Sequence, residues 1–297
     1  MTVRLKFFKC IFLFALASAS FANAQSTATR DYISNIVSWN KLAISGNIYN
    51  KLSYQFDIEY RRQADPESAS EPTASVGNSK SNAFKNPFQY ANRIWINYQV
   101  DKSLTFSISP IAWFGTWTAP VNGQISFQPE YRSSAQASFN QNLGRVIFNH
   151  RYRYDLRFMG LKTEDETNSI IGPASSYHFD KANIQSRFRY MLRATVPLNN
   201  TQIETGTYYT FSQAEILIRS GDNVKNINLV DQFRSALGLG YKFSDHFRFE
   251  LGYMNIIAYK FNNKVQNNID VLHTVTLSVF MDDFQGMFKK KIPEEKL

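Results

Sequence analysis

Several long segments of this chain alternate between apolar and polar residues, and only an extended strand separates such a period of two onto two faces. In residues 144–159 the even positions carry Val, Phe, His, Tyr and Leu, while the odd positions carry mostly Arg, Asn and Asp. The same alternation recurs in 51–61, 88–100 and 183–196. Each of these predicted strands therefore has one aromatic and aliphatic face and one charged face.

Short polar breaks alternate with longer polar loops between these segments, which is typical of an up-and-down array of hairpins. We expect 10 to 12 strands. Bacterial single-chain barrels normally have an even number of strands, so a further strand could lie in 116–128 or in 25–36. The eleven segments that the pattern predicts directly are 33–45, 50–63, 87–100, 104–115, 129–140, 144–159, 182–196, 202–217, 229–243, 246–260 and 269–282.

Two architectures fit a two-faced strand of this kind. A soluble β-sandwich would bury the apolar face, including Phe56, Tyr152 and Phe188, between two sheets. A transmembrane antiparallel up-and-down β-barrel would turn that face to lipid and the polar face to the lumen. Long strands, an apolar face rich in Tyr and Phe, and the alternation of short turns with long loops favour the barrel. The composition, with 43% apolar and 19% charged residues, is too polar for a helical membrane protein.

The N-terminus predicts export from the cytoplasm. Residues 1–24 combine basic residues, a short apolar stretch and an Ala-Asn-Ala ending, as a secretory signal peptide does. The sole cysteine, Cys10, lies inside this segment, so no structural disulfide is expected in the mature chain. We expect a barrel over 25–284, a short tail over 285–297, and a location in the cell outer membrane of a gram-negative bacterium. Although the formal net charge is +9, export argues against nucleic acid as a partner.

The charged face predicts a lumen rich in arginine. Guanidinium groups bind carboxylate and phosphate bidentately, so these residues could form an anion-preferring passage or an acidic-ligand site. They could equally form a salt-bridge network that fills a narrow interior, because a barrel of eight strands is just filled by side chains. The residues placed on this face are Arg61, Arg93, Arg151, Arg153, Arg157, Arg187, Arg189, Arg193, Arg234, Arg248, Asp57, Glu59, Asp155 and Glu250, with Glu204 beside them.

No catalytic, cofactor or metal motif stands out. Ser175, Ser176 and His178 are close in sequence and would be the least implausible site of a lipid-modifying hydrolase, the main alternative function. His150, on the apolar face of its strand, is expected to lie at the membrane interface, and His246 opens a strand. No histidine pair has metal-ligand spacing, and the acidic run 164–166 does not match a calcium loop.

The chain resembles a family of uncharacterised outer-membrane β-barrels, a domain of unknown function found in gram-negative bacteria. The resemblance covers about residues 31–282 and brings no assigned activity. For a porin-like barrel in the outer membrane, we expect outer-membrane lipid, lipopolysaccharide and the barrel-assembly machinery as partners, no cofactor, and a ligand that the sequence does not name. The segments that carry it are Tyr54–Arg61, Arg151–Arg157, Arg187–Tyr190, Val196–Asn199, Asp231–Arg234 and Gly238–Tyr241.

The sequence therefore predicts a non-catalytic outer-membrane β-barrel, either structural or a narrow and possibly anion-preferring solute passage. A soluble periplasmic β-sandwich that binds ligands is the second alternative.

Overall fold

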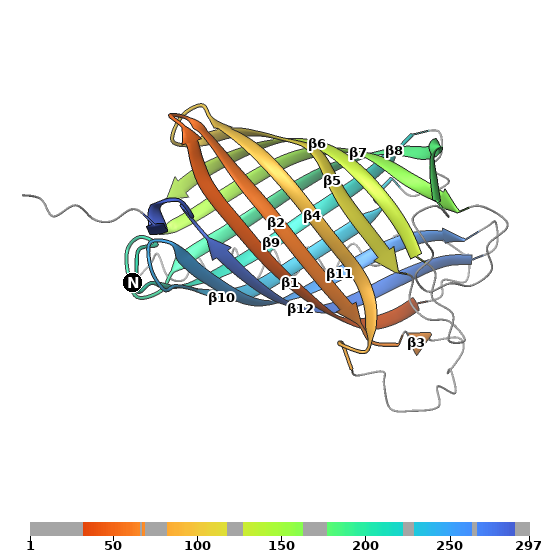
Figure 1. Cartoon of the computed structure of the whole chain (residues 1–297). Coiled ribbons are helices and arrows are strands. Elements are labelled where there is room, and N and C mark those ends of the chain that lie inside the picture. The colour runs from red at the N-terminus through yellow and green to blue at the C-terminus, as the bar shows by residue number, and fades with distance from the viewer. Residues whose placement is uncertain are drawn as a thin grey trace, which may run out of the picture.

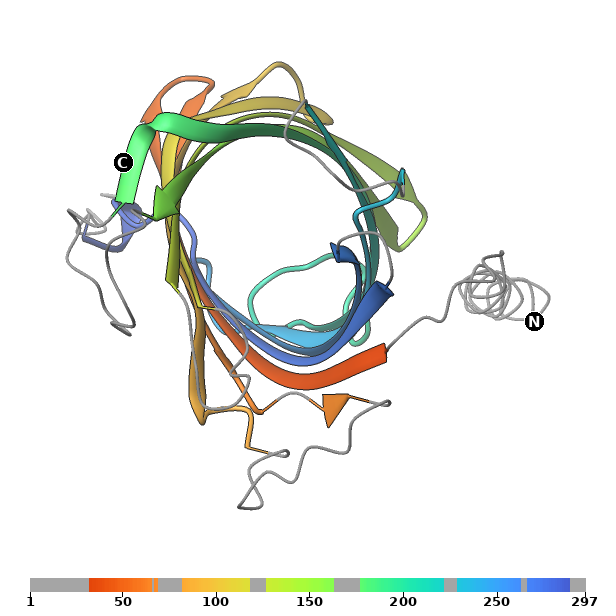
Figure 2. The same ribbon diagram turned by 90° about the vertical axis from the view of Figure 1, so that its right-hand side faces the viewer.

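The computed structural model describes residues 32–65, 67–68, 82–117, 127–162, 177–221, 229–262 and 266–288. These residues form one curved sheet that closes on itself (Figures 1 and 2). The strands are β1 (Tyr32–Tyr49), β2 (Leu52–Gln63), β3 (Glu67–Ser68), β4 (Asn86–Gln99), β5 (Leu104–Trp117), β6 (Phe127–Leu143), β7 (Val146–Lys162), β8 (Tyr177–Pro197), β9 (Tyr208–Ser220), β10 (Gln232–Lys242), β11 (Phe247–Asn262) and β12 (Gln266–Met281), followed by the 3-10 turn η3 (Gly286–Phe288).

Eleven long strands make the wall, and the two-residue β3 pairs only with the start of β1. Each long strand is antiparallel to the next one along the chain. Closure is different, because β12 pairs with β1 in parallel, from Tyr32 opposite Ile269 to Ile44 opposite Met281. An odd number of alternating strands requires this, since the first and last then run in the same direction. The predicted all-β barrel of 10 to 12 strands is confirmed, and the described residues contain no twelfth spanning strand.

The stagger of the strands sets the width of the barrel. Paired residues can be followed once around the wall from Asn47 of β1, and the path returns to β1 at Ile33, fourteen residues earlier. With a rise of about 3.3 Å per residue and about 4.8 Å between strands, this stagger tilts the strands by roughly 40° and makes the wall roughly 22 Å across. The path runs through Ser53, Asn97, Ser107, Gln136, Arg153, Arg189, Leu217, Gln232, Ala258 and Asp270.

A β-bulge in β5 changes which residues of that strand face inward. The register of β5 shifts by one residue against both neighbours between Ser109 and Ala112. Pro110 lies in this interval and has no N–H to donate to a ladder, which is where a strand accepts an extra residue. Ser107 and Ser109 are buried before the bulge, and Ala112 and Phe114 are buried after it. The residues of β5 that face the interior are therefore odd-numbered before the bulge and even-numbered after it.

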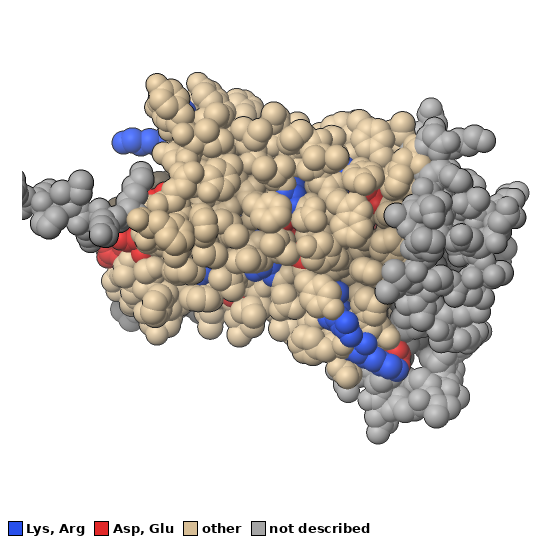
Figure 3. Space-filling model, viewed as in Figure 1, with Lys and Arg blue, Asp and Glu red and all other residues tan. Residues whose placement is uncertain are grey.

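The outer wall is apolar. Tyr152 and Phe188 keep 47% and 42% of their surface exposed, so the prediction of the soluble sandwich, that they lie between two sheets, is wrong. Charged side chains are few on the wall that Figure 3 presents. Large exposed apolar residues of the strands include Tyr60, Ile94, Tyr98, Phe106, Ile108, Tyr131, Phe139, Tyr154, Ile184, Tyr208, Ile216, Leu237, Leu239, Phe249, Leu251, Tyr253, Val275 and Leu277.

Two predicted strand boundaries need correction. β6 continues through 141–143, which we expected to be a turn, and the chain reverses at Gly144 and Arg145, where Gly144 has φ +61°. β9 begins at Tyr208 rather than at 202. Residues 198–207 instead form an irregular connection whose contacts include the hydrogen bond from Asn200 Nδ2 to Thr207 Oγ1.

The C-terminal end of the described chain continues along β1. After β12, the backbone N–H of Phe284 donates to the carbonyl of Ser45, and η3 follows at the end of the barrel that carries the short turns (Figure 1). No helix among the described residues is long and apolar enough to span a bilayer. The predicted signal peptide 1–24 and most of the predicted tail 285–297 lie outside the described residues.

Candidate functional site in the barrel interior

The interior holds a dense network of charged side chains. These come from all eleven long strands except β5, where serines, alanine and a phenylalanine are buried instead, and from Asp231 just before β10. Described cations outnumber anions there by four, even when Asp282 in the final turn is counted. The cations are Lys41, Arg61, Arg93, Arg132, Arg151, Arg153, Arg157, Arg187, Arg189, Arg193, Arg219, Arg234 and Arg248, and the anions are Asp57, Glu59, Glu130, Asp155, Glu215, Asp231, Glu250, Asp270 and Asp282.

Glu215 of β9 is the hub of the network. Arg189 donates to both of its carboxylate oxygens, from Nη2 at 2.8 and 2.9 Å and from Nε at 3.1 Å. Arg151 donates to the same carboxylate at 2.8 Å, and Arg234 approaches at 3.4 Å. One buried carboxylate thus connects β7, β8 and β10, three strands that surround its own. Asp155 lies 3.5 Å from Arg189 and accepts a hydrogen bond from Ser134 at 2.7 Å.

Three further carboxylates each hold two arginines. Glu130 of β6 accepts a bidentate pair from Arg157 at 2.7 and 2.8 Å, and also binds Arg132. Such bidentate contacts are the strong form of the guanidinium–carboxylate bond. Asp231 binds Arg187 at 3.3 Å and Arg219 at 2.8 Å. Glu250 accepts from Arg193 at 2.6 Å and from the Tyr209 hydroxyl at 3.0 Å, with Arg248 at 3.7 Å.

Some of the interior cations lie over aromatic rings. The Arg61 guanidinium lies 3.4 Å from the centre of the Trp39 ring and donates to Glu59 at 2.6 Å. Arg132 lies over Phe114, Arg193 over Phe211 and Arg248 over Phe280, at about 4 Å in each case. Cation–π contacts of this kind stabilise a positive charge without neutralising it.

Glycines in β10 leave room for two interior rings. A Cβ atom on Gly240 would lie 2.1 Å from the Tyr209 ring, and one on Gly238 would lie 2.5 Å from the Phe211 ring. Tyr209 and Phe211 are almost fully buried. Aromatic residues therefore point inward on β9, the reverse of the faces that the alternation assigned on 51–61 and 144–159.

Two arginines converge on a single indole ring. Arg153 of β7 and Arg93 of β4 have their guanidinium carbons 4.7 and 5.2 Å from the centre of the Trp95 ring. Both side chains are buried, at 7% and 6% exposure. Trp95 Nε1 donates to Asp57 at 3.2 Å, and Gln136 Oε1 accepts from Arg153 Nε at 2.9 Å and Nη2 at 2.6 Å. These two arginines form the least neutralised part of the described interior.

The fourteen interior residues named from the sequence all lie on the inner face of the wall and are mostly buried. Half of them pair with one another, and most of the others pair with charged residues that were not named. Glu204 is an exception and a correction, because it lies exposed in the connection before β9. The sequence reasoning missed Lys41, Arg132, Arg219, Glu130, Glu215, Asp231 and Asp270. Strand parity could have found Glu130 and Arg132, which share the even face of β6, whereas Glu215 shares its face with apolar Tyr209, Phe211 and Leu217.

Residues 37–268 match the model of a family described as "Protein of unknown function (DUF2490)". The chain belongs to the DUF2490 family. The matched segment begins inside β1 and ends just after the start of β12, so it takes in β2 to β11 in full and every member of the arginine network except Asp270 and Asp282. No curated protein matches the chain.

None of the described histidine side chains of this DUF2490 barrel pairs with an arginine or a carboxylate of the network. His150 is on the outer wall, as its parity predicted, and its Nδ1 lies 3.0 Å from the Tyr190 hydroxyl. His246 lies in the turn before β11 and contacts the Asp282 carbonyl. Ser175, Ser176 and the His178 side chain, the hypothetical hydrolase site, lie outside what the structure describes, as does the acidic run 164–166. Among the described residues no cluster could hold a metal ion.

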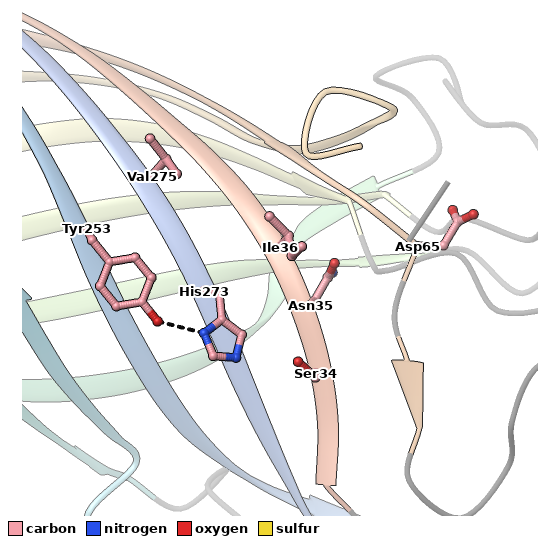
Figure 4. Close-up of a pocket in the computed structure, with 7 residues that line it drawn as sticks. All are labelled: Ser34, Asn35, Ile36, Asp65, Tyr253, His273 and Val275. Carbon is pink, nitrogen blue, oxygen red and sulfur yellow. Dashed lines mark hydrogen bonds between the residues drawn. The ribbon is translucent and has the colours of Figure 1, made fainter. Parts of the chain in front are cut away.

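A shallow cleft of about 290 Å³ lies where β1 meets β12. Figure 4 shows Tyr253 and His273 side by side, with the Tyr253 hydroxyl 2.6 Å from His273 Nδ1. Its other lining residues are Ser34, Asn35, Ile36, Asp65 and Val275. Tyr253 and Val275 face outward and are about half exposed, so this cleft lies on the outer wall and is separate from the arginine network.

Proposed function

We propose that this DUF2490 barrel spans the outer membrane. The strands of the wall are 11 to 21 residues long, and about 9–11 tilted residues cross the hydrocarbon region. An outer wall of Leu, Ile, Val, Phe and Tyr suits contact with lipid, whereas in water such a surface would promote aggregation. Outer-membrane lipid then surrounds the wall, lipopolysaccharide contacts the end with the long connections, and the barrel-assembly machinery inserts the chain.

Within that membrane we propose a non-catalytic role as a narrow passage that prefers anions. The observation that carries this proposal is the excess of interior cations over interior anions. A ring of fixed positive charge attracts anions and repels cations at close range. Eleven strands lie between the eight that side chains just fill and the sixteen or more of open porins, so the passage is narrow.

Conductance in a planar bilayer tests this function. The full mature chain, refolded in detergent and checked for heat-modifiable gel mobility, is inserted into a membrane with a tenfold KCl gradient. We expect discrete steps whose reversal potential has the sign of chloride selectivity. Arg153→Ala removes an interior cation that forms no ion pair with a described carboxylate and lies beside Trp95, and it moves the reversal potential toward that of potassium.

Lys102→Gln is the matched control, because it removes one positive charge from an exposed turn outside the wall. It leaves the reversal potential unchanged. A barrel that inserts and stays silent would overturn the passage and favour a lumen filled by salt bridges. Cation-selective steps would contradict the charge argument itself.

A further inference from the structure

The ion pairs inside the barrel leave two arginines out. Ten of the twelve interior arginines lie within 3.7 Å of a carboxylate, as does Lys41. Arg93 and Arg153 have no such carboxylate among the described residues. The Nε atom of Arg93 is buried without a hydrogen-bond partner there. The two exceptions are not scattered, because both guanidinium groups lie beside the same Trp95 ring.

The surroundings fix these arginines in place, and Glu59 and Asp155 attract them only from beyond ion-pair distance. The nearest carboxylate to the Trp95 indole, Asp57, is already engaged by Lys41 at 3.1 Å and by the indole N–H. Gln136, whose side-chain oxygen accepts two hydrogen bonds from Arg153, is neutral. Phe114, 5.2 Å from Arg93, is apolar. Burying two like charges without a directly paired carboxylate is costly, so a counter-ion from outside the chain would stabilise this arrangement.

We propose that Arg93 and Arg153 form an oxyanion site beside Trp95, which takes the phosphate or carboxylate group of a small solute. This deepens the proposed function, because the site lies within the passage and names the class of solute that would use it. Guanidinium forks bind oxyanions through paired hydrogen bonds, which chloride cannot match in geometry. Three other arginines of the network, Arg151, Arg189 and Arg234, are held by Glu215, and Arg189 also by Asp155, so they are not assigned to the site.

Phosphate binding to the folded barrel in detergent tests the site without any membrane passage. Isothermal titration with inorganic phosphate, at an ionic strength held constant with KCl, measures the dissociation constant. We expect saturable binding of one phosphate. Arg93→Gln and Arg153→Gln each weaken it by about tenfold or more, the effect of losing a charge-assisted hydrogen bond, and Lys102→Gln leaves it unchanged.

Thermal unfolding gives a second readout that a purely structural role would not produce. Phosphate raises the unfolding midpoint of the wild-type barrel, since a ligand stabilises the state that it binds. The double variant Arg93→Gln/Arg153→Gln has a higher midpoint than wild type in phosphate-free buffer, because the repulsion is gone, and no longer responds to phosphate.

Wild-type protein that shows no saturable phosphate binding would overturn the site, as would a double variant that binds phosphate as tightly as wild type. A failure of the proposed passage would give a different result from a failure of the site. A barrel that is silent in the bilayer but binds phosphate at Arg93 and Arg153 keeps the site and loses the passage.

Discussion

Replacing Glu215 with glutamine removes the charge at the hub of the interior network without changing the size of the side chain. The carboxylate is 2% exposed and accepts from Arg189 and Arg151 at 2.8 Å, with Arg234 at 3.4 Å. A glutamine amide can still accept one of these bonds through its oxygen. Its NH₂ group, however, would face guanidinium donors, so the buried Arg189 and Arg234 and the partly exposed Arg151 would lose their counter-charge.

The expected loss of stability follows from that imbalance. Removing one partner of a buried ion pair typically costs about 3–5 kcal/mol, because the other charge stays buried and uncompensated. For Glu215→Gln we expect a loss in this range, about 3–5 kcal/mol, since three arginines are affected but Asp155 still partly compensates Arg189. Urea unfolding in detergent micelles, followed by tryptophan fluorescence, measures it as a lower midpoint.

Two further variants separate this explanation from a general effect of mutation. Glu204→Gln, in an exposed connection, changes the free energy of unfolding by no more than about 0.5 kcal/mol. Arg189→Gln combined with Glu215→Gln recovers part of the loss, because the pair is then removed together. A loss below about 1 kcal/mol for Glu215→Gln alone would refute the reasoning, since it would mean that water reaches and screens the hub.

Two other predictions address the outer wall and a turn. Leu251 is 59% exposed on the outer wall. Leu251→Arg lowers the free energy of unfolding from lipid vesicles by about 2–4 kcal/mol. Leu229→Arg, which lies outside the strands, leaves it almost unchanged. Equal effects of the two substitutions would contradict a lipid-facing wall. In the turn after β4, hydrogen bonds from the Ser103 backbone and hydroxyl and from the Leu104 backbone lower the pKa of Asp101. Because this pKa is lower in the folded chain, its stabilisation is present at neutral pH and is lost as the pH falls through the folded pKa. Carboxyl NMR titration should find that pKa below its usual range in wild type and closer to it in Ser103→Ala; an unshifted wild-type pKa would disprove the turn contacts.

The alternation of the sequence was enough to predict most of the wall and its inner face. Arg151, Arg153 and Arg157 share a strand face with Asp155, and a period of two places them together whatever the tilt of the strand. The β5 bulge could not be predicted in the same way, because an added residue reverses the parity without changing composition. Glu215 of β9 was missed for another reason, since the other inward residues of that strand are largely aromatic where Gly238 and Gly240 of the next strand make room. The sequence also could not predict contacts between strands far apart in the chain. It placed Arg93 and Arg153 inside the barrel, but it could not show that both lie beside the same Trp95 ring.

The solvent exposure of the interior arginines indicates where a passage through this barrel would be narrowest. Arg151, Arg193 and Arg248, toward the end with the short turns, keep 20–29% of their side chains exposed, so water reaches that half. Arg132, Arg157 and Arg187, toward the long connections, are only 6–7% exposed around Glu130 and Asp231, whereas Arg219, which also binds Asp231, is 28% exposed. A lumen that only needed filling would be at least as stable with apolar residues in that layer. Charges retained among arginines as deeply buried as Arg132, Arg157 and Arg187 instead fit the selective passage proposed above.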